Sequence, residues 1–154
     1  MTPAVKYCTF LLDKHRFGIE VGRVQEVIRA LPVTSVPLAH PVFSGLINLR
    51  GQVVLGMDLR TRLDLPPRPA GRRPVNLILR TEEGPLSLLV DEIGDVLELG
   101  GDSFERPPET LQGPARNLIL GAHKLADRLV LILDVDRVIN LAPETVSADT
   151  VDEP

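Results

Sequence analysis

The sequence predicts a mostly β protein, made of two similar β subdomains packed over a shared hydrophobic core and each closed by a short capped helix. The 154-residue chain is dominated by short runs of Val, Ile and Leu that Gly, Pro or charged residues bound, which favours strands over long helices. Two further observations, an internal repeat and a proline-rich stretch between its two copies, indicate two subdomains. A hydrophobic content of 44% at this length is sufficient for an ordered core without disulfides.

The apolar runs predict two β-hairpins. Residues 7–12 and 17–21 flank the turn "DKHR", and residues 75–80 and 86–90 flank "TEEGP" in the same way. The segment after each hairpin, "GRVQEVI" in the first half and "DEIGDVL" in the second, is expected to be helix-like or bent.

Aligning the chain with itself supports two copies of one unit. At an offset of 69 residues (86 − 17), "FGIEVGRVQEVIRA" matches "LSLLVDEIGDVLEL", so that Val24 meets Ile93. At an offset of 76 (129 − 53), "VVLGMDLRTRL" matches "LVLILDVDRVI", so that Asp58 meets Asp134. Each of these aspartates follows an apolar strand and precedes an amphipathic run, where its carboxylate can cap the first turn of a helix. Two matches in the same order indicate an internal repeat.

Two segments are expected to lack regular structure. The connector 64–74, "DLPPRPAGRRP", holds four prolines and a glycine between the two halves. Residues 144–154 carry four acidic residues, no basic residue and little apolar content, which is typical of a disordered tail. The folded domain is therefore expected to span residues 1–143.

The composition excludes several classes of partner. A net charge of −4 gives no general attraction to nucleic acid or to anionic membranes. The basic group in the connector, Arg68, Arg72 and Arg73, has no aromatic residue among its members, so we expect no nucleic-acid binding.

No apolar run reaches the length of a spanning helix, and the single cysteine, Cys8, cannot form an internal disulfide. A cytoplasmic protein without direct membrane insertion is expected.

The chain shows no grouping of residues that predicts catalysis. It lacks a nucleophile motif, paired metal-ligand spacing and a phosphate-binding loop, so we expect no catalytic, cofactor-binding or metal-binding residues. The histidines, His15, His40 and His123, are expected to be solvated loop residues. The acidic cluster Asp91, Glu92 and Asp95 is expected to form a solvated face. A non-catalytic adaptor is the class that this pattern favours.

One arginine has two possible roles. In "LRGQ", Gly51 supplies the positive φ that hairpin turns of type I′ or II require. From the pattern alone, Arg50 is a solvated turn residue.

Four blocks of the sequence resemble the CheW-domain family. These are "GIEVGRVQEVI", "GLINLRGQVVLGMDLRTRL", "LSLLVDEIGDVLEL" and "DRLVLILDVDRVI", which occur in the family's order and cover most of residues 6–141. The resemblance implies two five-stranded SH3-like barrels packed over a hydrophobic core. It also implies a chemotaxis adaptor that performs no reaction and couples the cytoplasmic tips of methyl-accepting chemoreceptors to the regulatory domain of a CheA-type histidine kinase. Such a protein reaches the inner face of the membrane through receptor arrays.

The resemblance also implies a receptor groove between the barrels. Its positions in this chain are Cys8, Val21, Val24 and Ile93. In the family, the Arg of "NLRG" pairs with the Glu of "VQE". This pairing places Arg50 with Glu26 at the groove wall and makes Arg50 a functional residue.

Two other functions stay open. The first is a CheW-like scaffold of a non-flagellar chemosensory pathway, such as surface motility, pilus control or development. The second is a small enzyme with an unrecognised site, in which His123 or Asp91 would be required for turnover.

Overall fold

The computed structural model describes residues 3–29, 31–37, 40–107, 109 and 113–141. The strands of the first half are β1 (Val5–Leu12), β2 (His15–Glu20), β3 (Val24–Arg29), β4 (Val33–Thr34), β5 (Phe43–Leu49) and β6 (Gln52–Asp58). Those of the second half are β7 (Val75–Thr81), β8 (Gly84–Val90), β9 (Glu92–Leu99), β10 (Phe104–Glu105), β11 (Ile119–Lys124) and β12 (Leu129–Leu133). The helical segments are α1 (Leu59–Arg62), α2 (Pro114–Leu118), α3 (Val135–Ile139) and the 3₁₀ turns η1 (Val21–Arg23) and η2 (Gly101–Ser103).

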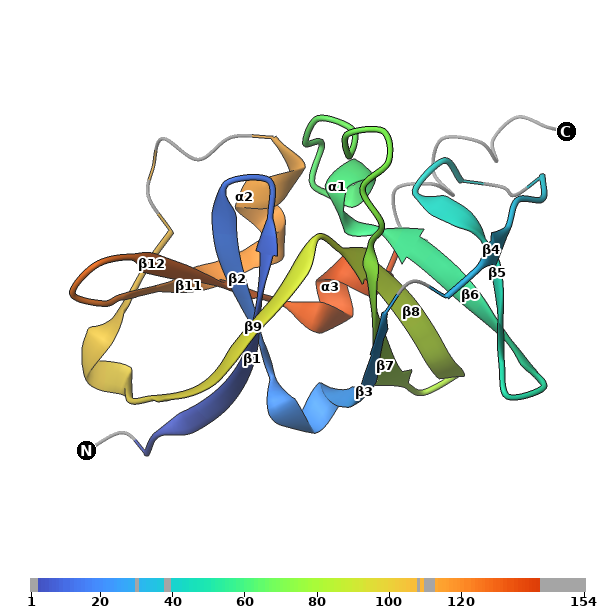
Figure 1. Ribbon diagram of the computed structural model, residues 1–154. Helices are drawn as coiled ribbons and strands as arrows, with labels where there is room; N and C mark the ends of the chain where they lie inside the picture. Colours follow the sequence, from blue (N-terminus) through green and yellow to red (C-terminus); the bar gives the residue numbers. More distant parts are fainter. Residues whose placement is uncertain (1–2, 30, 38–39, 108, 110–112, 142–154) are drawn as a thin grey trace, which may run out of the picture.

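The strands form two six-stranded sheets that lie side by side in Figure 1. The first sheet has the order β10-β11-β12-β2-β1-β9, and the second has the order β4-β5-β6-β8-β7-β3. The two orders become identical when β1 to β6 are matched with β7 to β12. The single parallel contact of each sheet, β12 with β2 and β6 with β8, also falls at the matching place. The topology therefore agrees with the internal repeat of the sequence.

Each half of the chain contributes strands to both sheets. Strand β3 leaves the first sheet and pairs with β7, and β9 crosses in the opposite direction to pair with β1. The segments "GRVQEVI" and "DEIGDVL", which we expected to be helix-like or bent, are therefore mainly these crossing strands. The expectation holds for Gly22 and Arg23, which lie in the 3₁₀ turn η1. It was wrong for the rest of the first segment, because the side chains of β3 alternate between half-buried and exposed, a period of two that a strand produces.

The prediction of a mostly β protein with two β units over a shared core is confirmed. Each unit has six strands where the resemblance implied five, and the additional β4 and β10 have two residues each. Among the described residues, the two end strands of each sheet do not pair with each other, so neither sheet closes by hydrogen bonds into a barrel.

One apolar cluster joins the two sheets. It contains Phe10 of β1, Leu77 of β7, Leu59 of α1 and Val135 of α3, all buried. A large apolar side chain that is fully buried stabilises a fold by roughly 1.5–3 kcal/mol relative to an exposed one. The two halves therefore share one core.

Both predicted helix caps are present. The carboxylate of Asp58 accepts a hydrogen bond from the backbone N–H of Arg60 at 3.1 Å, at the start of α1. The carboxylate of Asp134 accepts one from the N–H of Arg137 at 3.2 Å, at the start of α3. Loss of such a cap typically costs about 1 kcal/mol.

The proline-rich connector runs from α1 to β7 without a strand or helix among its residues. The predicted tail 144–154 lies outside the described residues. The described helices have at most five residues, and none has the length and apolarity needed to cross a bilayer.

Candidate functional site

Arg50 and Gly51 form the two-residue turn between β5 and β6. Both have positive φ, 52° for Arg50 and 87° for Gly51, which is the signature of a type I′ hairpin turn. The backbone N–H of Gly51 donates a hydrogen bond to the side-chain oxygen of Asn48 at 2.8 Å. The turn therefore holds the backbone of Arg50 at a fixed place on the hairpin.

The guanidinium of Arg50 meets Glu26 with two parallel contacts. Its Nη1 donates to Glu26 Oε2 at 2.9 Å, and its Nη2 donates to Oε1. The hydrogen bond from Arg50 lowers the pKa of Glu26 below its ordinary range. Glu26 lies on β3, at one end of the sheet order, and β7 and β8 separate this strand from the hairpin that carries Arg50. The pair therefore bridges two parts of the sheet that are not neighbours in hydrogen bonding.

The positions implied for a receptor groove differ in exposure. Val21 of η1 has 37% of its surface exposed, while Val24 of β3 and Ile93 of β9 are half-buried and pack against the main core. Cys8 is different because it lies inside that core with 6% exposed. Burial also raises the pKa of its thiol. Cys8 is therefore not available as part of an exposed receptor surface.

A buried cluster of charged side chains lies where β8 ends and β9 begins. The carboxylate of Asp91 accepts hydrogen bonds from Arg60 Nε at 3.0 Å, from Arg60 Nη2 at 2.6 Å and from Arg68 Nε at 3.0 Å. Arg68 also contacts Asp58 at 3.3 Å, and the backbone N–H of Asp13 donates to Asp91 at 2.8 Å. The expectation that Asp91 belongs to a solvated face was wrong.

This cluster connects four parts of the fold. Asp13 belongs to the β1–β2 turn of the first sheet, Arg60 to α1, Arg68 to the connector, and Asp91 to the crossing between the sheets. Burial alone would raise the pKa of Asp91, but the hydrogen bonds from Arg60, Asp13 and Arg68 outweigh it and lower the pKa to about 2. The carboxylate is therefore ionised, and its charge holds the two sheets and the connector together.

The sequence gives only a weak signal for this cluster. Arg60 follows the capping aspartate in "DLR", and Asp91 ends the second hairpin, but 31 residues separate them. Nothing in the local sequence pattern links these positions, so Arg60 could not be predicted as the partner of Asp91 from the sequence.

His123 differs from the sequence-based expectation for this region. His123 was expected in a solvated loop, but it lies on β11 with 2% exposed, 2.7 Å from the Ser103 hydroxyl at Nδ1. Its ring packs between Tyr7 and Phe104, with centroids 5.6 and 5.2 Å away, and burial lowers its pKa. That expectation was therefore wrong. Over the described part of the chain, no three His, Cys, Asp or Glu side chains are grouped as metal ligands would be.

Comparison with known proteins gives consistent matches. Residues 6–142 match the model of the CheW-like domain. The chemotaxis protein CheW of Bacillus subtilis (strain 168) is 30% identical over 135 residues, covering 88% of this chain and 86% of the relative. The chemotaxis protein CheW of Klebsiella aerogenes is 24% identical over 139 residues, covering 90% and 84%.

A solved structure also matches this fold. The crystal structure of the scaffolding protein TtCheW from Thermoanaerobacter tengcongensis superposes with a TM-score of 0.75 at 25% sequence identity, over 87% of this chain and 90% of the other. The family model, the relatives and the shared fold agree over nearly the whole described chain. This protein belongs to the CheW-like domain family.

Proposed function

We propose that this protein is a non-catalytic chemotaxis adaptor, which couples the cytoplasmic tip of a methyl-accepting chemoreceptor to the regulatory domain of a CheA-type histidine kinase. The observation that carries the proposal is the match to the CheW-like domain over residues 6–142. Relatives that are named chemotaxis proteins and a structural relative described as a scaffolding protein support it. In this role the protein works in the cytoplasm and reaches the membrane through receptor arrays.

The physical requirement of such an adaptor is a rigid body that holds two partners in a fixed relation. The shared apolar core and the Asp91 cluster meet this requirement, because both connect the two sheets. Strands β3 and β9 also cross between the two sheets in opposite directions, so each adds a covalent and hydrogen-bonded connection between them. The fold therefore suits a scaffold that holds two bound partners at a fixed distance and orientation.

The proposed receptor surface consists of Val21, Val24 and Ile93. Val21 and Val24 lie three residues apart on η1 and β3, and Ile93 is the repeat partner of Val24 on the other crossing strand. A helical hairpin with an apolar stripe can bury such positions. Glu26 lies on the same strand as Val24, and its pair with Arg50 connects this strand to the β5–β6 hairpin.

A binding experiment with matched variants tests the proposal. Purified protein is titrated with a receptor tip fragment and separately with a kinase regulatory domain. Val21→Glu should weaken receptor binding by about tenfold or more, because it places a charge on the proposed contact, and 1.4 kcal/mol corresponds to a factor of ten. Leu129→Glu is the control, since Leu129 is also an exposed apolar residue, at 48%, on a distant hairpin. Failure of the unmodified protein to bind either partner would refute the proposal.

A further inference from the structure

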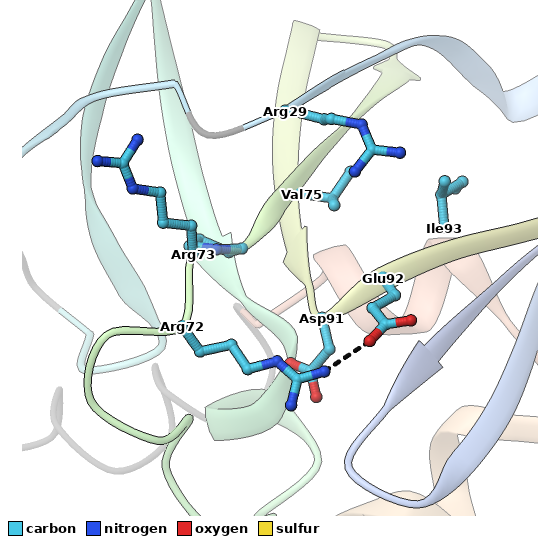
Figure 2. Close-up of a pocket in the computed structure, with 8 residues that line it drawn as sticks. Arg29, Arg72, Arg73, Val75, Asp91, Glu92 and Ile93 are labelled. Carbon is cyan, nitrogen blue, oxygen red and sulfur yellow. Dashed lines mark hydrogen bonds and ion pairs between the residues drawn. The ribbon is translucent and has the colours of Figure 1, made fainter.

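A cavity of about 510 Å³ opens between the end of β3, the connector and the start of β9. Figure 2 shows its labelled side chains, with Arg29, Arg72 and Arg73 around the apolar Val75 and Ile93. Val75 is buried, and Ile93 is half-buried. The cavity therefore combines a cationic rim with an apolar floor.

Most charges of this cavity are already compensated. Arg72 Nη2 donates to Glu92 at 2.6 Å, and Asp91 is paired with the buried Arg60 and with Arg68, whose side chain is 10% exposed.

Arg29 and Arg73 are both exposed. Within the described ranges, neither has a carboxylate partner, although the chain as a whole carries a net charge of −4. A guanidinium is weakly hydrated and presents its donors in a fork that matches a carboxylate. Two positive charges at this cavity are thus available to an acidic ligand.

The directions of the two side chains limit what that ligand can be. In Figure 2, the guanidinium of Arg29 lies on the side of Val75 and Ile93, whereas Arg73 projects to the opposite side. A single small anion cannot contact both groups in this arrangement. A peptide segment with separated acidic side chains, and an apolar side chain beside the acidic one that meets Arg29, can contact both arginines and Ile93.

We propose that Arg29 and Arg73 anchor an acidic segment of the receptor tip, which places an apolar side chain against Ile93. This inference rests on the proposed function, because Ile93 belongs to the proposed receptor surface. The anchoring makes receptor binding dependent on salt, since ions screen exposed charge pairs.

The test compares receptor binding of three proteins at about 50 mM and about 500 mM salt, where the screening length falls from more than 10 Å to less than 8 Å. The test variant is Arg29→Glu with Arg73→Glu. The control, Lys124→Glu with Arg128→Glu, makes the same change of charge on the β11–β12 hairpin. Circular dichroism checks that all three are folded. The test variant should bind about tenfold more weakly at low salt, with a smaller difference at high salt, and the control should stay within about twofold.

The outcomes separate this inference from the proposed function. If the unmodified protein binds the receptor fragment and the Arg29 and Arg73 variant binds equally well, the inference is refuted and the proposed function stands. If the unmodified protein does not bind the fragment, the proposed function and the receptor assignment both fail.

A second probe, the peptide Glu-Leu-Glu-Glu-Leu-Glu, tests the site without the receptor. Binding that depends on Arg29 and Arg73 supports a site for acidic segments, and absence of binding by both the unmodified protein and a chain shortened to residue 143 overturns it. A variant that ends at Pro143 identifies the competing occupant. If it binds the peptide about tenfold more tightly than the full chain, the acidic residues 144–154 occupy the site, and the receptor assignment is overturned.

Discussion

Replacement of Asp91 by Asn removes one negative charge from the buried cluster while the side chain keeps the same number of heavy atoms. The carboxylate of Asp91 accepts three hydrogen bonds from Arg60 and Arg68 and one from the backbone of Asp13. An amide keeps only one oxygen, and its NH₂ group would face a donor. The variant therefore tests whether this cluster holds the sheets together.

The pKa of Asp91 sets a first estimate of the effect. Lowering the pKa from its ordinary value of 3.8 to about 2 corresponds to about 2 kcal/mol, at about 1.4 kcal/mol for each factor of ten in proton affinity. The substitution also leaves the guanidiniums of Arg60 and Arg68, 5% and 10% exposed, without their carboxylate. Breaking a buried pair in this way costs roughly 3–5 kcal/mol. Arg68 keeps its contact with Asp58, so we expect about 3 kcal/mol.

Urea unfolding of the pure protein measures this loss, with thermal unfolding as a second readout. About 3 kcal/mol should lower the melting temperature by roughly 6–12 °C in a domain of this size. The control is Glu92→Gln, which removes the neighbouring carboxylate from a pair with Arg72 that is about half exposed and should cost at most about 1 kcal/mol. A loss below about 0.5 kcal/mol for Asp91→Asn, or an equal loss for both variants, would show that the buried cluster does not hold the sheets together.

Three further outcomes follow from the same contacts. The difference in unfolding free energy between the unmodified protein and Asp91→Asn should have its full size above about pH 5 and shrink as the pH falls toward 2, because a carboxylate with a lowered pKa stabilises the fold only while it is ionised. Equal differences at pH 6 and pH 3 would contradict this expectation. Arg50→Ala and Glu26→Gln should each weaken receptor binding by about tenfold. The urea midpoint of unfolding should change little, because the pair is largely exposed on the Arg50 side. Undiminished receptor binding would make Arg50 a turn residue only. Cys8 should react with a soluble thiol reagent at least about 100-fold more slowly in the native protein than in urea, because it is buried and its thiol pKa is raised; rapid native labelling would place it on the surface.

Sequence patterns were sufficient where local chemistry decides the structure. The apolar runs gave the two hairpins β1–β2 and β7–β8, and the aspartates after β6 and β12 cap α1 and α3. The repeat also holds in the strand order, because the same apolar pattern folds in the same way twice. The family resemblance placed Arg50 and Glu26 together, and the structure has them in contact.

The features that the sequence did not predict depend on contacts between residues far apart in the chain. The segments that became β3 and β9 looked bent because their partners, β7 and β1, lie in the other half of the chain. Four consecutive residues of β1 are buried, so alternation could not indicate that Cys8 faces the core. The Asp91–Arg60 pair spans 31 residues and forms only when the connector and the crossing strand meet.

The proposed coupling of receptor to kinase can be measured directly. The most direct measurement is the autophosphorylation rate of a CheA-type kinase with membrane-embedded chemoreceptors, with and without this protein and with Val21→Glu in its place. We expect that the receptors change the kinase rate only when the unmodified protein is present, and that Val21→Glu largely abolishes this control. Receptor control of equal size without the protein would show that this protein does not couple receptor to kinase.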